Sequence, residues 1–253
     1  MRNLKFEFDL FFISEASLNE HQHNLINTLV VPKEEFKKNS SLSNVVNNST
    51  YQTWNLTYDF VIVAEPGWYE CLNDDLRNEI KLEMINNGHE LIHHNHLVTA
   101  HYWEQLNIDE QQAFIHQFDD EFSTTDIQYF HQYPHLTKLH NTFPNEHGAN
   151  CLSATIFAIT KNPFILEHWM HQEAFLLYLK RLGYFEVESS FISGDVICFY
   201  QDEILTHASY AIDDEYVFNK QGQTFWEPWM IDKFETIQNH RNEVNYKVYK
   251  KLR

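Results

Sequence analysis

The fold of this chain is organised around the stretch Gly148-Ala149-Asn150-Cys151-Leu152-Ser153-Ala154-Thr155-Ile156-Phe157-Ala158. Gly148 lets the backbone turn tightly, and the apolar run after Cys151 predicts a helix that extends to about residue 160, before Pro163. A thiol at the N-terminus of a helix meets partial positive charge and unpaired N–H donors, and both favour the thiolate. Cys151 is therefore a candidate nucleophile, and its own backbone N–H is a candidate donor to an oxyanion.

A thiol nucleophile needs a base and a group that orients that base. His207 lies near the start of a predicted strand, 206–212, and Asn219 lies 219 − 207 = 12 residues later, across the turn Asp213-Asp214. If the two strands form one hairpin, both side chains lie near its same end. We therefore predict His207 as the base and Asn219 as the orienting residue, with Gln221 in reserve. The ordinary alternatives are a small buried cysteine and a solvated or core histidine.

Four segments resemble the NlpC/P60 superfamily of papain-like cysteine hydrolases. They are Cys151-Leu152-Ser153-Ala154, Gly194-Asp195-Val196-Ile197, His207-Ala208-Ser209-Tyr210-Ala211-Ile212 and Asn219. Such proteins place a cysteine at a helix N-terminus, a Gly-Asp turn before a strand, a histidine at the start of the next strand and a polar residue one strand later. The resemblance covers roughly residues 145–252.

The resemblance implies that Cys151 is the nucleophile, His207 the base and Asn219 the third residue. The chain also departs from the family's pattern. Asn150 stands where family members often have Asp, Ser153 where they have Gly, and Asn219 where many have His. Many members are secreted and cut peptidoglycan peptides, whereas no export signal is visible here. The resemblance therefore informs fold and chemistry more than substrate.

Polar and aromatic residues crowd the segment 219–229, which includes Gln221 and Trp226. We predict that this segment walls one side of a cleft, so that Asn150, Gln221 and Trp226 contact the substrate. The alternative is a turn with two core tryptophans, because tryptophan is commonly buried.

A competing motif, His89-Glu90-Leu91-Ile92-His93, matches H-E-x-x-H. On a helix, such a motif binds zinc through two histidines one turn apart and uses the glutamate as base. Here it follows Asn86-Asn87-Gly88, which predicts the end of the preceding helix, so we expect a short strand. On a strand, positions 89 and 93 lie about 13 Å apart, too far to share one zinc ion. Three alternatives to a thiol hydrolase remain: a zinc hydrolase, a ligand-binding protein of the same fold without catalysis, and an acyltransferase that shares the Cys-His pair and differs only in its acceptor.

Composition and charge narrow the range of expected partners, substrates and compartments. The formal net charge of −18 disfavours nucleic acid and anionic membranes as partners, and it suits a small-molecule or peptide substrate that is neutral or cationic. Three cysteines, an odd and sparse count, predict reduced thiols in a cytoplasm rather than a disulfide framework. The charged start of the chain lacks the apolar core of a signal peptide, and no run approaches a membrane span. We expect no metal and no cofactor.

The pattern of elements predicts an α+β protein. Residues 1–145 form a mixed α/β cap or substrate-selecting region, and residues 146–253 form the NlpC/P60-like catalytic unit of helices on an antiparallel sheet. The expected helices are 74–86, 98–121 in two pieces around Asn107, 151–160, 171–182 and a short one at 229–237. The expected strands are 4–10, 59–64, 196–200, 206–212, 216–219 and 244–248, and residues 38–53 and 126–145 are expected to be loops.

Overall fold

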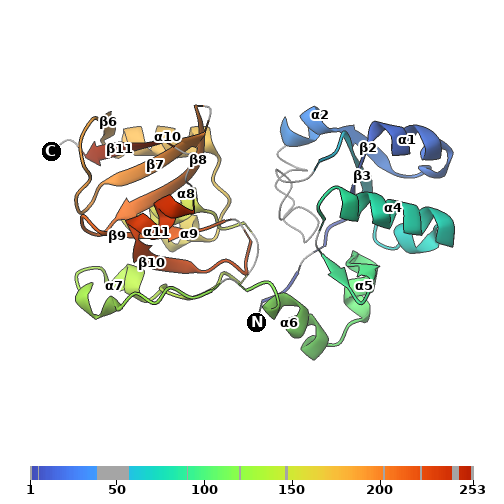
Figure 1. Ribbon diagram of the computed structural model, residues 1–253, viewed down its shortest axis with the longest axis horizontal. Coiled ribbons are helices and arrows are strands. Elements are labelled where there is room, and N and C mark those ends of the chain that lie inside the picture. The colour runs from blue at the N-terminus through green and yellow to red at the C-terminus, as the bar shows by residue number, and fades with distance from the viewer. Residues whose placement is uncertain are drawn as a thin grey trace. The chain divides into compact units, whose positions relative to one another are not determined.

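A computed structural model describes residues 2–4, 6–38, 57–89, 91–119, 121–145, 148–201, 203–222, 224–240 and 245–251 (Figure 1). It is a mixed α+β protein with antiparallel sheets, as predicted. The chain divides into two compact units, Asn3–Gln117 and Phe118–Arg253, and Arg2 groups with the second. None of the helices in these ranges is long and apolar enough to cross a membrane.

The first unit is built on a three-stranded antiparallel sheet in the order β1-β3-β2, and a two-stranded hairpin, β4-β5, lies outside it. Its elements are β1 (Asp9–Ile13), α1 (Glu15–His21), η1 (Gln22–Asn24), β2 (Leu29–Pro32), α2 (Lys33–Lys38), β3 (Phe60–Ala64), η3 (Tyr69–Cys71), α4 (Asp74–Asn86), β4 (Ile92–His93), β5 (His96–Leu97), α5 (Ala100–Gln105) and α6 (Ile108–His116).

The second unit is built on a six-stranded antiparallel sheet in the order β10-β9-β8-β7-β11-β6. Its elements are η4 (Ile127–Tyr129), α7 (Pro134–Thr137), α8 (Cys151–Thr160), α9 (Pro163–Leu166), α10 (Gln172–Arg181), β6 (Tyr184–Val187), β7 (Val196–Gln201), β8 (Ile204–Ala211), β9 (Tyr216–Lys220), β10 (Trp229–Lys233), α11 (Phe234–Asn239) and β11 (Asn245–Lys251).

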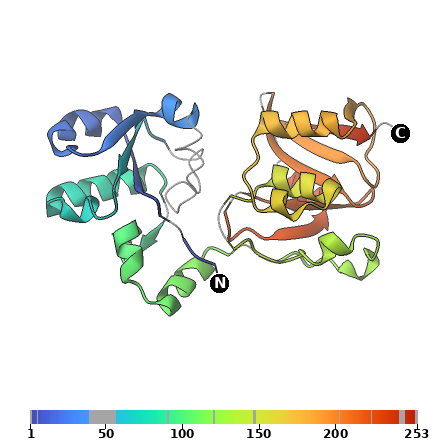
Figure 2. The ribbon, with the colours of Figure 1, turned by 180° about the vertical axis from the view of Figure 1, so that it is seen from behind.

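Helices cover both faces of this sheet. Figure 1 shows α11 in front of the strands, and Figure 2, the view from behind, shows α8 and α10 over the other face. The α8 face carries Cys198, Ala208, Tyr210 and Phe218 in the main core. The α11 face carries a smaller cluster of Phe191, Ile197, Phe199, Ala211, Val217, Ile237 and Val248. We call these the α8 face and the α11 face.

Several predicted elements are confirmed with their boundaries. Helix α4 spans the predicted residues, and Asn73 caps it by accepting a hydrogen bond from the Leu76 N–H at 2.9 Å. The predicted break at Asn107 separates α5 from α6, because Asn107 and Glu110 form a capping box. Helix α8 begins at Cys151.

Other predictions were wrong in part. The strand expected at 4–10 begins only at Asp9, because its ladder partner β3 pairs with Asp9–Ile13. The helix expected at 229–237 begins as β10, which pairs with β9, and only then becomes α11. The loop expected at 38–53 lies outside the described residues except for Lys38, which ends α2.

The expected domain boundary at residue 145 lies inside the second unit. Residues 118–145 run beside β10, where Thr142 forms a β-bridge with Trp229. The Ser123 hydroxyl donates to the Ile231 carbonyl at 2.9 Å, and the Ile231 N–H donates to His140 Nδ1 at 3.1 Å. These bonds to an edge strand assign the segment to the sheet of the second unit.

Candidate functional site

The start of α8 is held by Asn150. Its Oδ1 accepts a hydrogen bond from the Ser153 N–H at 2.9 Å, and Ser153 Oγ accepts one from the Asn150 N–H at 3.0 Å. Asn150 Nδ2 donates to the Met170 carbonyl at 2.8 Å. Both polar atoms of this side chain therefore fix the helix terminus that presents Cys151, which is a supporting rather than a substrate-contacting arrangement.

Asn150→Ala should lower the free energy of unfolding of the second unit by about 1–2 kcal/mol, because it removes the N-cap and leaves helix N–H groups without a partner. Asn150→Ser should recover part of this loss, since a serine hydroxyl also caps but does not reach Met170. Urea denaturation of the three proteins measures both differences. Equal stability of Asn150→Ala and wild type would contradict the capping role.

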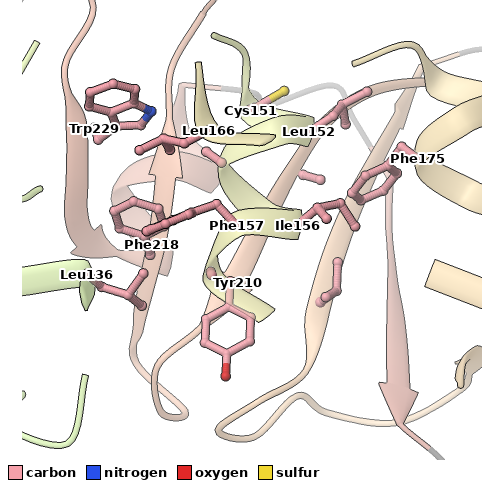
Figure 3. Close-up of a cluster of buried hydrophobic side chains, with 14 of the residues drawn as sticks. Leu136, Cys151, Leu152, Ile156, Phe157, Leu166, Phe175, Tyr210, Phe218 and Trp229 are labelled. Carbon is pink, nitrogen blue, oxygen red and sulfur yellow. The ribbon is translucent and has the colours of Figure 1, made fainter. Parts of the chain in front are cut away.

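Cys151 is the first residue of α8 and is 9% exposed. Figure 3 shows its sulfur at one end of the core cluster, with Tyr210 at the other. Cys198 belongs to the same cluster, where burial raises the pKa of its thiol well above the ordinary value, helped by the nearby Cys151 and Glu186. Cys198 is therefore expected to stay protonated and unreactive. The third cysteine, Cys71, is exposed and belongs to the first unit.

His207 lies at a β-bulge. Phe199 is opposite His207, whereas the next residue, Tyr200, is opposite Leu205, so Thr206 is the extra residue on β8. The His207 ring is fully buried, with its centroid 5.6 Å from that of Phe199. Bulges are frequent beside active sites, where they redirect a side chain.

Ser209 lies beside His207, and its Oγ is 3.3 Å from His207 Nε2. Strands β8 and β9 pair through Tyr210–Phe218 and Ala211–Val217, and Ser209 and Asn219 are the next residues along the two strands. Asn219 is fully buried, and neither its Oδ1 nor its Nδ2 has a hydrogen-bond partner among the described residues. A buried amide without partners requires an explanation, and a functional site is one of the few.

The three predicted catalytic residues lie on two sides of the sheet. Strand alternation places His207 and Asn219 on the α11 face, with Phe199 and Val217. Cys151 belongs to the core on the α8 face, which also contains Ala208, the residue after His207. The structure therefore places His207 and Asn219 on one face of the sheet. It places Cys151 on the opposite face, which is lined by Ala208.

The segment after Asn219 is tightly organised. The fully buried Lys220 ammonium donates to the carbonyls of Gly222 at 3.0 Å and Thr224 at 2.5 Å. Glu227 accepts from the Thr224 N–H and hydroxyl, both at 2.8 Å, and a Cβ at Gly222 would clash with its carboxylate. This loop fixes the end of β9 that carries Asn219.

The two other predicted substrate contacts also lie in or after this loop. Trp226 is buried, and its ring lies 5.0 Å from that of Phe225 and 5.1 Å from that of Phe118, so it packs as a core residue. Gln221 is half-buried.

The sequence analysis did not identify Ser209 and Lys220 as residues of the site. A serine two residues after a strand histidine shares its face, and that signal was present.

The described residues of the His89–His93 motif are not helical. His89 follows α4 in a buried, irregular position, and burial lowers its pKa to about 4. The expected strand begins only at Ile92, and His93 Nδ1 lies 3.0 Å from the Tyr102 hydroxyl. The helical context that a zinc hydrolase requires is therefore missing. The one group of three possible metal ligands among the described residues is elsewhere in the first unit, at Glu20, His21 and Glu79.

No family model, curated protein or solved structure matches this chain.

Proposed function

We propose that the second unit is a cysteine hydrolase of the papain-like NlpC/P60 type that cleaves amide or peptide bonds. The observation that carries the proposal is the buried His207–Ser209–Asn219 group at the bulge of β8, which follows a cysteine at a capped helix N-terminus. Buried polar side chains are costly, and here they surround the one histidine that the motif order assigns as base.

The proposed chemistry begins with proton transfer from the Cys151 thiol to His207. Because Nε2 faces Ser209, the accepting nitrogen in this proposal is Nδ1. His207 points to the α11 face, whereas Cys151 belongs to the core on the α8 face. The proposed transfer therefore requires the thiol and the imidazole to approach each other from the two sides of the sheet.

The thiolate then attacks the carbonyl carbon, a carbon–sulfur bond forms, and the carbon–nitrogen bond breaks as His207 returns its proton to the leaving amine. The N–H groups at the start of α8 stabilise the oxyanion. Water adds to the thioester carbon, His207 takes its proton, and the carbon–sulfur bond breaks. The net charge of −18 favours a neutral or cationic substrate.

The test is the pH profile of iodoacetamide alkylation at each of the three cysteines, resolved by peptide mass spectrometry. Cys151 should be alkylated at lower pH than the exposed Cys71, although it is largely buried, and Cys198 should stay unreactive because its pKa is raised. A Cys151 profile that matches that of Cys71, or no reaction below that range, would reject the catalytic proposal and favour a ligand-binding protein of the same fold.

A further inference from the structure

The hydroxyl of Ser209 is a side-chain contact of His207. Ser209 is fully buried, and its Oγ lies 3.3 Å from Nε2 of the imidazole. The two residues are two positions apart on β8 and share the α11 face. A hydroxyl can accept one hydrogen bond and donate another at once, which an amide nitrogen or a methyl group cannot do.

Asn219 is on the same face of the neighbouring strand, β9. The paired residues of β8 and β9 are Tyr210–Phe218 and Ala211–Val217, and Ser209 and Asn219 are the next residues along the two strands, one step beyond the last pair. Because directly opposite residues have Cβ atoms about 5 Å apart, residues one step beyond a pair are near enough for a rotation of the amide to bring Oδ1 toward the hydroxyl. The backbone of Asn219 is fixed by its pairing with Met230 on the other side, so only the side chain has to move.

We infer that Ser209 is a positioning residue that connects Asn219 to His207, an inference that rests on the proposed function of His207 as base. His207 Nε2–H donates to Ser209 Oγ, and the Ser209 hydroxyl donates to Asn219 Oδ1. This order keeps the proton on Nε2 and leaves the Nδ1 lone pair to accept the thiol proton. Asn219 thereby acts through Ser209 instead of touching the imidazole.

The connection also gives the Oδ1 atom of the buried amide a hydrogen-bond partner. A fully buried Asn219 with no partner among the described residues is costly, whereas an amide at the end of a chain of hydrogen bonds strengthens each bond in the chain. Burial of all three side chains excludes water that would compete for Nε2.

The experiment compares Ser209→Ala, Asn219→Ala and the double variant, each in a Cys71→Ser background. The readout is the midpoint of Cys151 ionisation, taken from the pH profile of alkylation. Each single variant should raise this midpoint by about one pH unit, the equivalent of one hydrogen bond, and the double variant should raise it no further than either single one. Ser123→Ala, which removes a hydroxyl that is hydrogen-bonded to β10 in the same unit, is the matched control and should have no effect.

A second measurement reads the wild-type protein itself and uses a variant only to assign the signals. At a pH above that at which the imidazolium loses its proton, the ¹⁵N chemical shifts of His207, assigned by their loss in His207→Ala, should show the tautomer protonated at Nε2. The tautomer protonated at Nδ1 would overturn the inference, and so would a double variant in which the two shifts add to about two pH units. If His207→Ala lowers Cys151 ionisation but Ser209→Ala does not, only this inference fails. If His207→Ala has no effect, the proposed function itself fails.

Discussion

Alanine in place of His207 is expected to move the midpoint of Cys151 ionisation up by about three pH units, and to cut its thiolate fraction at about pH 6.5 roughly a hundredfold. A thiol with an ordinary pKa near 8.5 is only about 1% ionised at that pH. A cysteine paired with an imidazolium is largely thiolate there. The helix N-terminus of α8 remains in the variant, so the residual effect of the macrodipole is measured at the same time.

The thiolate fraction is the better readout than the raw alkylation rate, because the nucleophilicity of a thiolate falls as its pKa falls and partly offsets the gain in ionisation. His168→Ala is the matched control, since this exposed histidine lies in the same unit with its Nδ1 2.6 Å from the Phe164 carbonyl. An unchanged midpoint in a folded His207→Ala protein would show that the thiol and the imidazole do not meet.

Local signals in the sequence predict the elements that carry the site. Gly148 and the apolar run after Cys151 locate the start of α8, and Asn87-Gly88 locates the end of α4. Each signal depends on hydrogen bonds between residues a few positions apart. This is why the helix boundaries agree with the prediction.

The features that the sequence did not predict depend on pairing between residues that are far apart in the chain. The bulge that aims His207 exists because Thr206 has no opposite residue on β7, which depends on the register of two strands. The segment 118–145 joins the second unit through bonds to Trp229 and Ile231, about ninety residues further along the chain. Neither the composition nor the turns of the segment 118–145 indicate that it pairs with β10.

Asparagine in place of Asp9 is expected to stabilise the first unit above about pH 7 by up to about 4 kcal/mol. Asp9 is only 2% exposed, and its Oδ2 has no partner among the described residues. Burial raises the pKa of this carboxyl from 3.8 to about 7, the Ala100 N–H lowers it, and the charge of Glu70 raises it further. In asparagine, Oδ1 can still accept from the Ala100 N–H, which lies 2.8 Å from the acid oxygen.

The sign follows from the direction of the pKa shift. The unfolded carboxyl loses its proton near pH 4 and the folded one near pH 7, so the unfolded state binds fewer protons between these values. The contribution of Asp9 to stability is therefore complete below about pH 4 and is lost as the pH rises through about 7. The wild type should weaken across this range, whereas Asp9→Asn should not show this loss and should equal the wild type near its lower end.

Hydrogen exchange of the β1 and β3 amides at about pH 5 and pH 8.5 measures this difference in the first unit alone, because these strands form its central sheet. Asp75→Asn removes the same charge from an exposed position in the first turn of α4, and it should cost only a few tenths of a kcal/mol at both pH values. Glu70 Oε2 also lacks a partner among the described residues, and the amide introduced by Asp9→Asn would offer it a donor. If Asp9→Asn were no more stable than wild type at the higher pH, Asp9 would have to be ionised and paired there, which its buried position beside Glu70 opposes.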